Sequence, residues 1–131
     1  MWKYISVVAI SIYLLAAVSF SAQQMNEPDS PCFNVGVTYD AVECLLKAKE
    51  SSDAALNSIY QEIRKRLEGD DAKRLVETER LWIQYRDANC EAERALYEPG
   101  TAAQPAYLAC IEAMTRARTK ELRITYTVRL K

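Results

Sequence analysis

Residues 79–90 read ERLWIQYRDANC, and this stretch decides the fold. It contains neither glycine nor proline, so nothing interrupts a helix. At 3.6 residues per turn Ile83 and Cys90 share one line, while Leu81, Trp82 and Tyr85 widen the apolar surface beside it. A surface helix usually carries one apolar stripe of about 100°. The wider apolar surface predicts a central helix, over about 71–97, that touches two partner helices.

The chain opens with the pattern of a secretory signal peptide. Lys3 precedes an uncharged apolar run of 17 residues, Tyr4–Phe20, and the small residues Ser21 and Ala22 follow it. The alternative is a short transmembrane anchor, because 17 residues stand at the lower limit for spanning a bilayer. We predict that residues 1–22 are cleaved and that the chain is exported, periplasmic or secreted, with no membrane partner after cleavage.

The mature charge is balanced. Loss of Lys3 leaves 16 basic and 18 acidic residues, a net charge of −2. This balance, without a basic run interleaved with aromatics, argues against a nucleic-acid partner and is compatible with a cationic one. The chain has no histidine and only three glycines, which removes His-based catalysis, His metal ligands and a glycine-rich phosphate loop. Carboxylate pairs such as Asp70-Asp71 stand where helix starts are expected. We predict no enzyme, no cofactor and no metal site.

The mature chain divides into an irregular leader, 23–37, and an all-α domain, 38–131. Three- and four-residue apolar spacing predicts a first helix over about 39–68, which Gly69 ends. Pro99-Gly100 stops the helix of 71–97, and a third helix starts at Pro105 and frays near Lys131. Short connections between long helices predict a small antiparallel up-down-up three-helix bundle.

Four cysteines in a small exported domain predict two disulfides. Cys90 and Cys110 stand at similar distances on either side of the turn near residue 101, so they face each other. Cys32 lies on a leader that can fold back to Cys44. We predict the pairs Cys32–Cys44 and Cys90–Cys110; the alternative, Cys44–Cys90, requires about one turn of stagger between the first two helices.

Polar side chains interrupt the apolar faces of the predicted helices. A buried charge is tolerated when it is paired, so these groups predict a polar core that fixes helix register. The alternative is an exposed recognition patch. The predicted structural polar core comprises Asn57, Tyr60, Trp82, Tyr85, Arg86, Asp87, Thr115 and Arg118.

These residues also resemble a known family. The matches are Leu56-Asn57-x-x-Tyr60, Trp82-Ile83-x-Tyr85-Arg86-Asp87-x-x-Cys90, Gly100-Thr101, and Cys110 followed by Thr115-x-x-Arg118-x-x-x-Leu122. In this order they are similar to the LprI-type lysozyme inhibitor domain, from about Cys32 to Leu122. Glu79 departs from the glutamine usual there, and no lipid-attachment motif is present. The resemblance implies a helical, disulfide-bonded protein of the bacterial envelope and, for some members, inhibition of lysozyme; it transfers no inhibitory residue.

Two functions follow as expectations. The first is an inhibitor that binds a lysozyme-type muramidase. The loop Leu96–Gln104 is then the predicted partner contact, through Tyr97, Glu98, Gly100 and Thr101. In the alternative reading this loop is a solvent-exposed helix connection. The second function is a non-enzymatic binding or scaffolding module of the envelope that has no lysozyme target.

Overall fold

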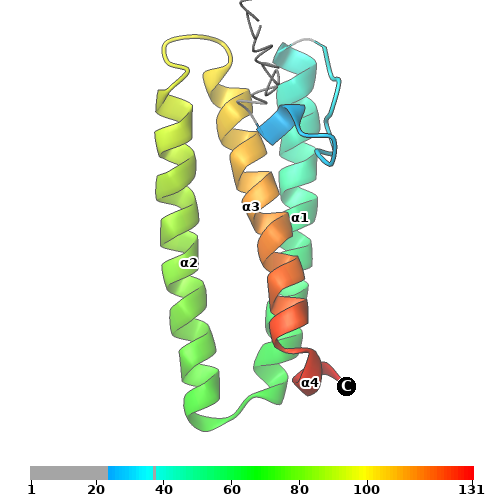
Figure 1. The fold of residues 1–131 in the computed structure, drawn as a ribbon, viewed down its shortest axis with the longest axis vertical. Coiled ribbons are helices and arrows are strands. Elements are labelled where there is room, and N and C mark those ends of the chain that lie inside the picture. The colour runs from blue at the N-terminus through cyan, green and yellow to red at the C-terminus, as the bar shows by residue number, and fades with distance from the viewer. Residues whose placement is uncertain (1–23, 37) are drawn as a thin grey trace, which may run out of the picture.

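The computed structural model describes residues 24–36 and 38–131, so the predicted signal peptide, 1–22, lies outside the described residues. All regular elements within these ranges are helical, as the sequence predicts (Figure 1). They are the short 3-10 helix η1 (Gln24–Asn26), α1 (Thr38–Arg66), α2 (Gly69–Ala95), α3 (Ala103–Thr125) and α4 (Thr127–Leu130).

The up-down-up arrangement is confirmed. Figure 1 shows α1 and α3 running in the same direction and α2 running against both. Helix α1 continues without a break through the polar residues Ser51-Ser52-Asp53. Gly69 adopts φ 55°, a left-handed conformation open to glycine, and so lets the chain reverse between α1 and α2. Asp70 and Asp71 then lie in the first turn of α2, where carboxylates favour the helix dipole.

The prediction that the helix of 71–97 is central is wrong, because α3 occupies that place. Both α1 and α2 pack mainly against α3, and α1 makes the longer contact. The buried residues of α2 are few: Ala72, Leu75, Glu79 and Cys90. Those of α3 are many and include the small residues Ala106 and Ala109, which let α1 approach closely. Large apolar residues of α2, among them Leu81 and Tyr85, are exposed instead.

The core is built from three apolar clusters along the bundle. At the end where α1 meets α2, apolar side chains of the three long helices and of the α1–α2 turn form one cluster: Leu56, Ile59, Ile63, Leu67, Ala72, Leu75 and Leu122. At the other end Leu45 and Leu108 pack with the leader, while Cys90, Cys110 and Ile111 pack between α2 and α3. Each fully buried leucine or isoleucine contributes about 1.5–3 kcal/mol by leaving water.

Both predicted disulfides are present. Cys32 bonds to Cys44 and ties the leader to α1, and Cys90 bonds to Cys110 and joins α2 to α3. The leader also packs against α3, where Arg116 Nη1 lies 2.8 Å from Asp29 Oδ2. The hydrogen bond and charge of Arg116 hold the pKa of Asp29 below its usual value. The irregular leader is therefore fixed to two helices.

The described part of the chain contains no helix that is long and apolar enough to cross a bilayer.

Candidate functional site: a buried ion-pair core and an acidic loop end

A buried ion pair joins α2 to α3 near the middle of the bundle. The Nε and Nη2 atoms of Arg118 donate to Glu79 Oε2 at 3.1 and 3.0 Å. The two side chains are only 12% and 8% exposed, so the charges depend on each other. Burial lowers the pKa of Arg118, but hydrogen bonds to Glu121 and Glu79 outweigh it and raise the pKa above its usual value. The Arg118 guanidinium therefore stays charged.

A second guanidinium lies one layer closer to the loop. Arg86 Nη1 donates to Thr115 Oγ1 at 3.1 Å, and its Nε and Nη2 donate to Asp87 Oδ1. Asp53 Oδ1 of α1 lies 3.7 Å from Arg86 Nη1. The guanidinium thus brings together polar groups from all three long helices, and 14% of its side chain is exposed. Arg86 therefore connects α2 to both α1 and α3.

Trp82 lies between the two guanidinium groups. Its ring centroid is 5.3 Å from Arg86 Cζ and 5.6 Å from Arg118 Cζ, within the range of cation–π attraction. The indole is half-buried and covers one edge of the apolar cluster. The residues Glu79, Trp82, Arg86, Thr115 and Arg118 form what we call the polar spine.

The predicted polar core is partly wrong. Trp82, Arg86, Asp87, Thr115 and Arg118 do come together. Asn57 is exposed, and Tyr85 is 62% exposed, because the positions of both turn away from α3. Tyr60 is half-buried and packs on the apolar cluster. Asp87 caps the spine from the solvent side, its side chain 51% exposed.

Sequence reasoning missed the acids that neutralise the core. Glu79 and Glu112 are buried, and Asp53 faces Arg86. Glu112 pairs with Arg116 at 2.9 Å, with 4% of the glutamate side chain exposed. Spacing offered a signal: Glu79 precedes Trp82 by three residues and Arg86 by seven, which puts all three on one helix face. A buried arginine on a facing helix requires such an acid.

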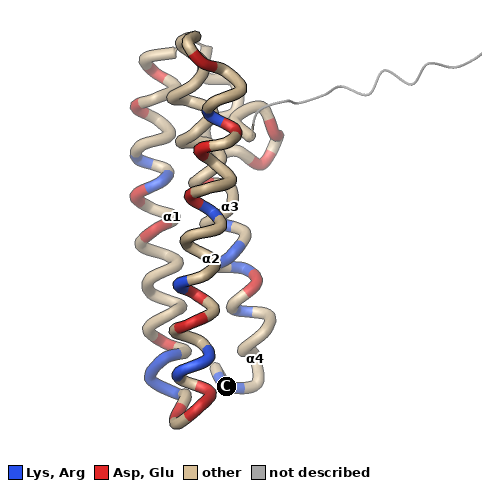
Figure 2. The backbone as a smooth tube through the Cα atoms, turned by 90° about the vertical axis from the view of Figure 1, so that its left-hand side faces the viewer, with Lys and Arg blue, Asp and Glu red and all other residues tan. Residues whose placement is uncertain are grey.

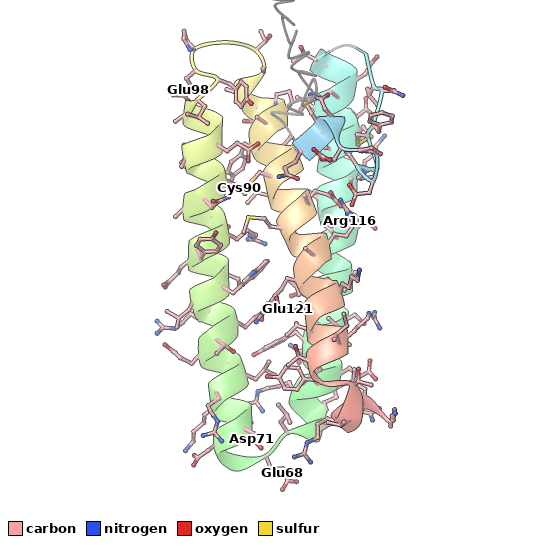
Figure 3. All side chains as sticks on the ribbon, viewed as in Figure 1. Glu68, Asp71, Cys90, Glu98, Arg116 and Glu121 are labelled. Atoms are coloured by element: carbon pink, nitrogen blue, oxygen red, sulfur yellow. A yellow bond between two sulfur atoms is a disulfide. The ribbon has the colours of Figure 1, made fainter. Side chains whose placement is uncertain are left out.

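The predicted contact loop lies at the end of the bundle opposite the α1–α2 turn (Figure 3). Arg94, in the last turn of α2, forms ion pairs with Glu91 and with Glu98, the first loop carboxylate. Tyr97 is half-buried and its carbonyl accepts from Gly100 N at 2.8 Å, whereas Thr101 is exposed. A β-carbon on Gly100 would lie 3.0 Å from the same carbonyl oxygen, which makes glycine the fitting residue there. The loop is thus short, and it is held by the ion pair of Glu98 with Arg94 and by the hydrogen bond from Gly100 to Tyr97.

Charge is segregated along the bundle, and the Arg86 layer divides the two halves. The loop half, residues 24–36, 38–53 and 86–116, carries 11 acidic and five basic residues, a net charge of −6. The other half, residues 54–85 and 117–131, carries seven acidic and 11 basic residues, a net charge of +4. In Figure 2 the Lys and Arg positions concentrate accordingly in the lower part. In the loop half every cation within the described residues forms an ion pair, while four acids form none: Glu27, Asp40, Glu50 and Glu93.

Glu93 offers a pH-dependent test of this half. Its carboxyl is partly buried, and burial raises its pKa above the usual value. The folded chain therefore binds this proton more tightly than the unfolded chain, so the contribution to stability is full below the unfolded pKa and is lost as the pH rises through the folded pKa. We expect Glu93→Gln to melt higher than wild type at pH 7, with the difference shrinking towards pH 3.5. Glu50→Gln, which replaces an exposed carboxylate, should melt like wild type at every pH. If the difference in melting temperature between Glu93→Gln and wild type does not change with pH, the Glu93 carboxyl is solvated in the folded protein.

These features define a class of protein: a small all-helical domain, stapled by two disulfides, with an ion-paired core and an acidic end. A family model described as "Lysozyme inhibitor LprI" matches residues 31–122. The chain therefore belongs to the LprI lysozyme inhibitor family. The match runs from the leader, just before Cys32, to Leu122, and so covers both disulfides and the polar spine.

A curated relative extends over most of the chain. It is an uncharacterized protein of Rhizobium meliloti, 26% identical, and the match covers 88% of this chain and 90% of the relative. No solved structure matches the chain. Within the described residues, no group of three or more histidine, cysteine, aspartate or glutamate side chains is placed to hold a metal ion.

Proposed function

We propose that this protein is an exported inhibitor that binds a lysozyme-type muramidase. Membership of the LprI lysozyme inhibitor family is the observation that carries the target class. We propose further that it acts by binding alone, without catalysis. Its buried charges support this, because in the polar spine both arginines and their acids are engaged with each other and with Trp82.

The loop half is the contact surface in this proposal. Its net charge of −6 suits a cationic enzyme, since opposite potentials steer two proteins together and orient their encounter. Glu98 and Thr101 stand at the tip of this half, and the Cys90–Cys110 bond fixes the two helices below them. A rigid tip loses little conformational freedom on entering a cleft, which favours tight binding.

The test is a turbidity assay, in which a muramidase clears a suspension of bacterial cells and the purified exported protein is added as the inhibitor. Animal-type and phage-type enzymes are both needed, each with the protein at micromolar concentration. We expect inhibition of a cationic enzyme, with an association rate that falls as salt rises past about 0.15 M, where charges are screened beyond about 8 Å. No inhibition of either enzyme type would contradict the inhibitor function and leave the alternative, an envelope binding or scaffolding module.

A pair of variants locates the contact. Tyr97→Ala/Glu98→Ala removes the aromatic ring and the carboxylate at the start of the loop, and we expect inhibition to weaken at least tenfold, the scale of a binding hot spot. The matched control is Tyr85→Ala/Glu77→Ala, which makes the same changes at exposed positions of α2 in the other half of the bundle. Equal inhibition by the loop variant and wild type would keep the inhibitor function and remove the loop from the contact.

A further inference from the structure

The unpaired cations of this protein are gathered at one end. Among the described residues six lysines and arginines form no ion pair, and all six belong to the half opposite the loop: Arg64, Lys65, Lys120, Arg123, Arg129 and Lys131. All are exposed. They lie on the last turn of α1, on the C-terminal part of α3, on α4 and at the residue after it, so the fold brings together two segments that are far apart in the sequence.

Exposed apolar side chains stand among these cations. Ile124 is 65% exposed and Val128 is 78% exposed, and each adjoins an arginine in the sequence, Arg123 and Arg129. Arg66 Nη1 donates to the backbone carbonyl of Arg129 at 3.2 Å, which attaches α4 to the end of α1. The end of the bundle therefore carries two exposed apolar side chains next to unpaired cations, with the exposed carboxylates of Glu68 and Asp71 at the neighbouring α1–α2 turn.

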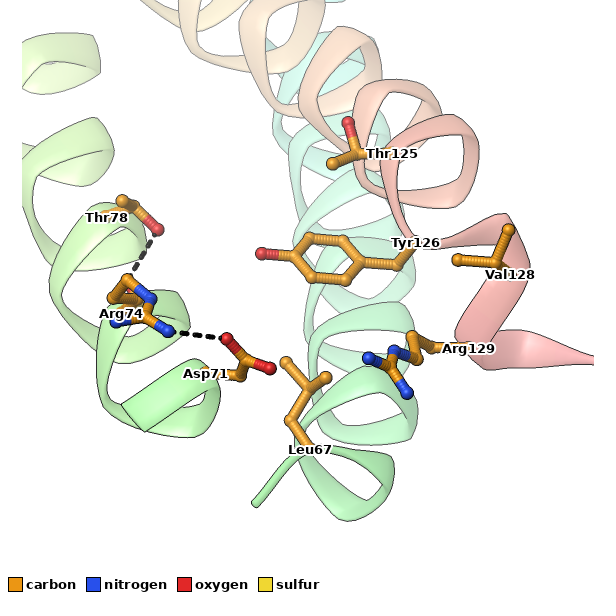
Figure 4. Close-up of a pocket in the computed structure, with 8 residues that line it drawn as sticks. All are labelled: Leu67, Asp71, Arg74, Thr78, Thr125, Tyr126, Val128 and Arg129. Atoms are coloured by element: carbon orange, nitrogen blue, oxygen red, sulfur yellow. Dashed lines mark hydrogen bonds and ion pairs between the residues drawn. The ribbon is translucent and has the colours of Figure 1, made fainter. Parts of the chain in front are cut away.

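A cleft of about 430 Å³ opens beside this surface, between the N-terminal part of α2 and the junction of α3 with α4 (Figure 4). Arg74 is held at its wall by Asp71, with Nη2 and Oδ1 2.7 Å apart. Figure 4 shows Tyr126 pointing across the cleft towards α2, with Arg129 on the α4 side. The Arg129 guanidinium has no carboxylate partner within the described chain, so it is available to an anionic group outside the protein.

We propose that this end, which we call the basic end, binds the surface of an anionic lipid bilayer. Positive charge near such a surface attracts the protein, and apolar side chains gain by entering the boundary between headgroups and acyl chains. A bilayer offers both kinds of contact at once, whereas a soluble polyanion offers charge alone. The sequence expectation of no membrane partner concerns a segment that spans the bilayer, and a surface contact requires no such segment.

This placement gives the bundle an orientation. A helix of 29 residues, the length of α1, extends roughly 44 Å at 1.5 Å per residue. With the basic end on the bilayer, the acidic loop half stands away from it by about that distance and faces the surrounding fluid. The functional value of this orientation rests on the proposed inhibitor function. The binding of the basic end to lipid does not depend on inhibition and is tested separately.

The experiment is co-sedimentation of the exported protein with vesicles of phosphatidylcholine containing 30% phosphatidylglycerol, against phosphatidylcholine alone. We expect binding to the anionic vesicles that falls when salt is raised to 0.5 M. Arg123→Gln/Arg129→Gln should weaken partitioning about 30-fold, since each cation near an anionic surface is worth about fivefold. Ile124→Ser/Val128→Ser should weaken it several-fold without a change in charge.

The matched control is Lys47→Gln/Lys49→Gln, which removes two cations from the loop half and should bind vesicles like wild type. Equal binding to both vesicle types, or equal losses in the two charge variants, would overturn the proposal. If heparin binds as tightly as anionic vesicles and the Ile124/Val128 variant is unaffected, the partner is a soluble polyanion instead. Arg123→Gln/Arg129→Gln should inhibit a muramidase like wild type in the absence of vesicles, which separates failure of this proposal from failure of the inhibitor function.

Discussion

Arg118→Ala should lower the free energy of unfolding by about 3–5 kcal/mol, because it leaves the Glu79 carboxylate buried without its partner. Glu79 is 8% exposed, and among the described residues its Oε1 atom has no hydrogen-bond partner. The substitution also removes one of the two cations that contact Trp82. Thermal melting at pH 7 should show a fall of more than about 12 °C for a domain of this size.

Two variants test the reason for this loss. Arg80→Ala breaks a pair with Glu77 in which the side chains are 62% and 53% exposed, and it should cost at most about 1 kcal/mol. Glu79→Leu/Arg118→Met removes both buried charges together, and should recover most of the stability that Arg118→Ala loses. A double variant as unstable as Arg118→Ala would show that packing of the arginine stem, and not the stranded carboxylate, causes the loss.

The helices and disulfides follow from local sequence signals. Gly69 and Pro99-Gly100 mark the two turns whatever the tertiary packing is. Once the turns are fixed, the distances of Cys90 and Cys110 from the second turn determine their level in the bundle, which is why their pairing is predictable. Boundaries differ by a few residues: the structure ends α3 at Thr125 and continues in the short helix α4, where the sequence predicts that the third helix frays.

The choice of central helix could not be made from apolar content. Large residues such as Leu81 and Tyr85 make α2 look apolar on several sides, yet both are exposed. Close packing between α1 and α3 depends on small residues instead, and Ala106 and Ser52 are both buried. A small side chain buries little area by itself, but it shortens the distance between helix axes and lets the larger neighbours meet.

The two charged ends were also beyond the sequence pattern. The net charge of −2 is the sum of −6 in the loop half and +4 in the other half. The chain reverses at Gly69 and again at Pro99, so each half combines segments that are far apart in the sequence. The last turn of α1, which carries Arg64 and Lys65, comes to lie beside α4 and its Arg129 only in the folded bundle, where Arg66 contacts the Arg129 carbonyl. Surface partners depend on this three-dimensional sum of charge, which composition does not report.

Replacing the Cys90–Cys110 disulfide by Cys90→Ala/Cys110→Ala should lower the free energy of unfolding by about 3 kcal/mol. The bond closes a loop with a sequence separation of 20, and its loss returns conformational freedom to the unfolded chain. Both cysteines are almost fully buried, so the variant also loses contacts with Ile111. Melting under non-reducing conditions measures the effect, and the Arg86 layer below should keep the variant helical by circular dichroism.

The second disulfide provides the control that connects stability to function. Cys32→Ala/Cys44→Ala opens a loop with a separation of 12, for which the same argument gives a similar loss of about 3 kcal/mol. It frees the leader, whereas loss of Cys90–Cys110 frees the α2 and α3 ends that carry Glu98 and Thr101. At a temperature where both variants are folded, we expect muramidase inhibition to weaken in the Cys90/Cys110 variant alone. Equal inhibition by the two variants would show that the loop does not need the Cys90–Cys110 disulfide to bind the enzyme. Recognition would then rest on the acidic charge of the loop half, which both variants keep.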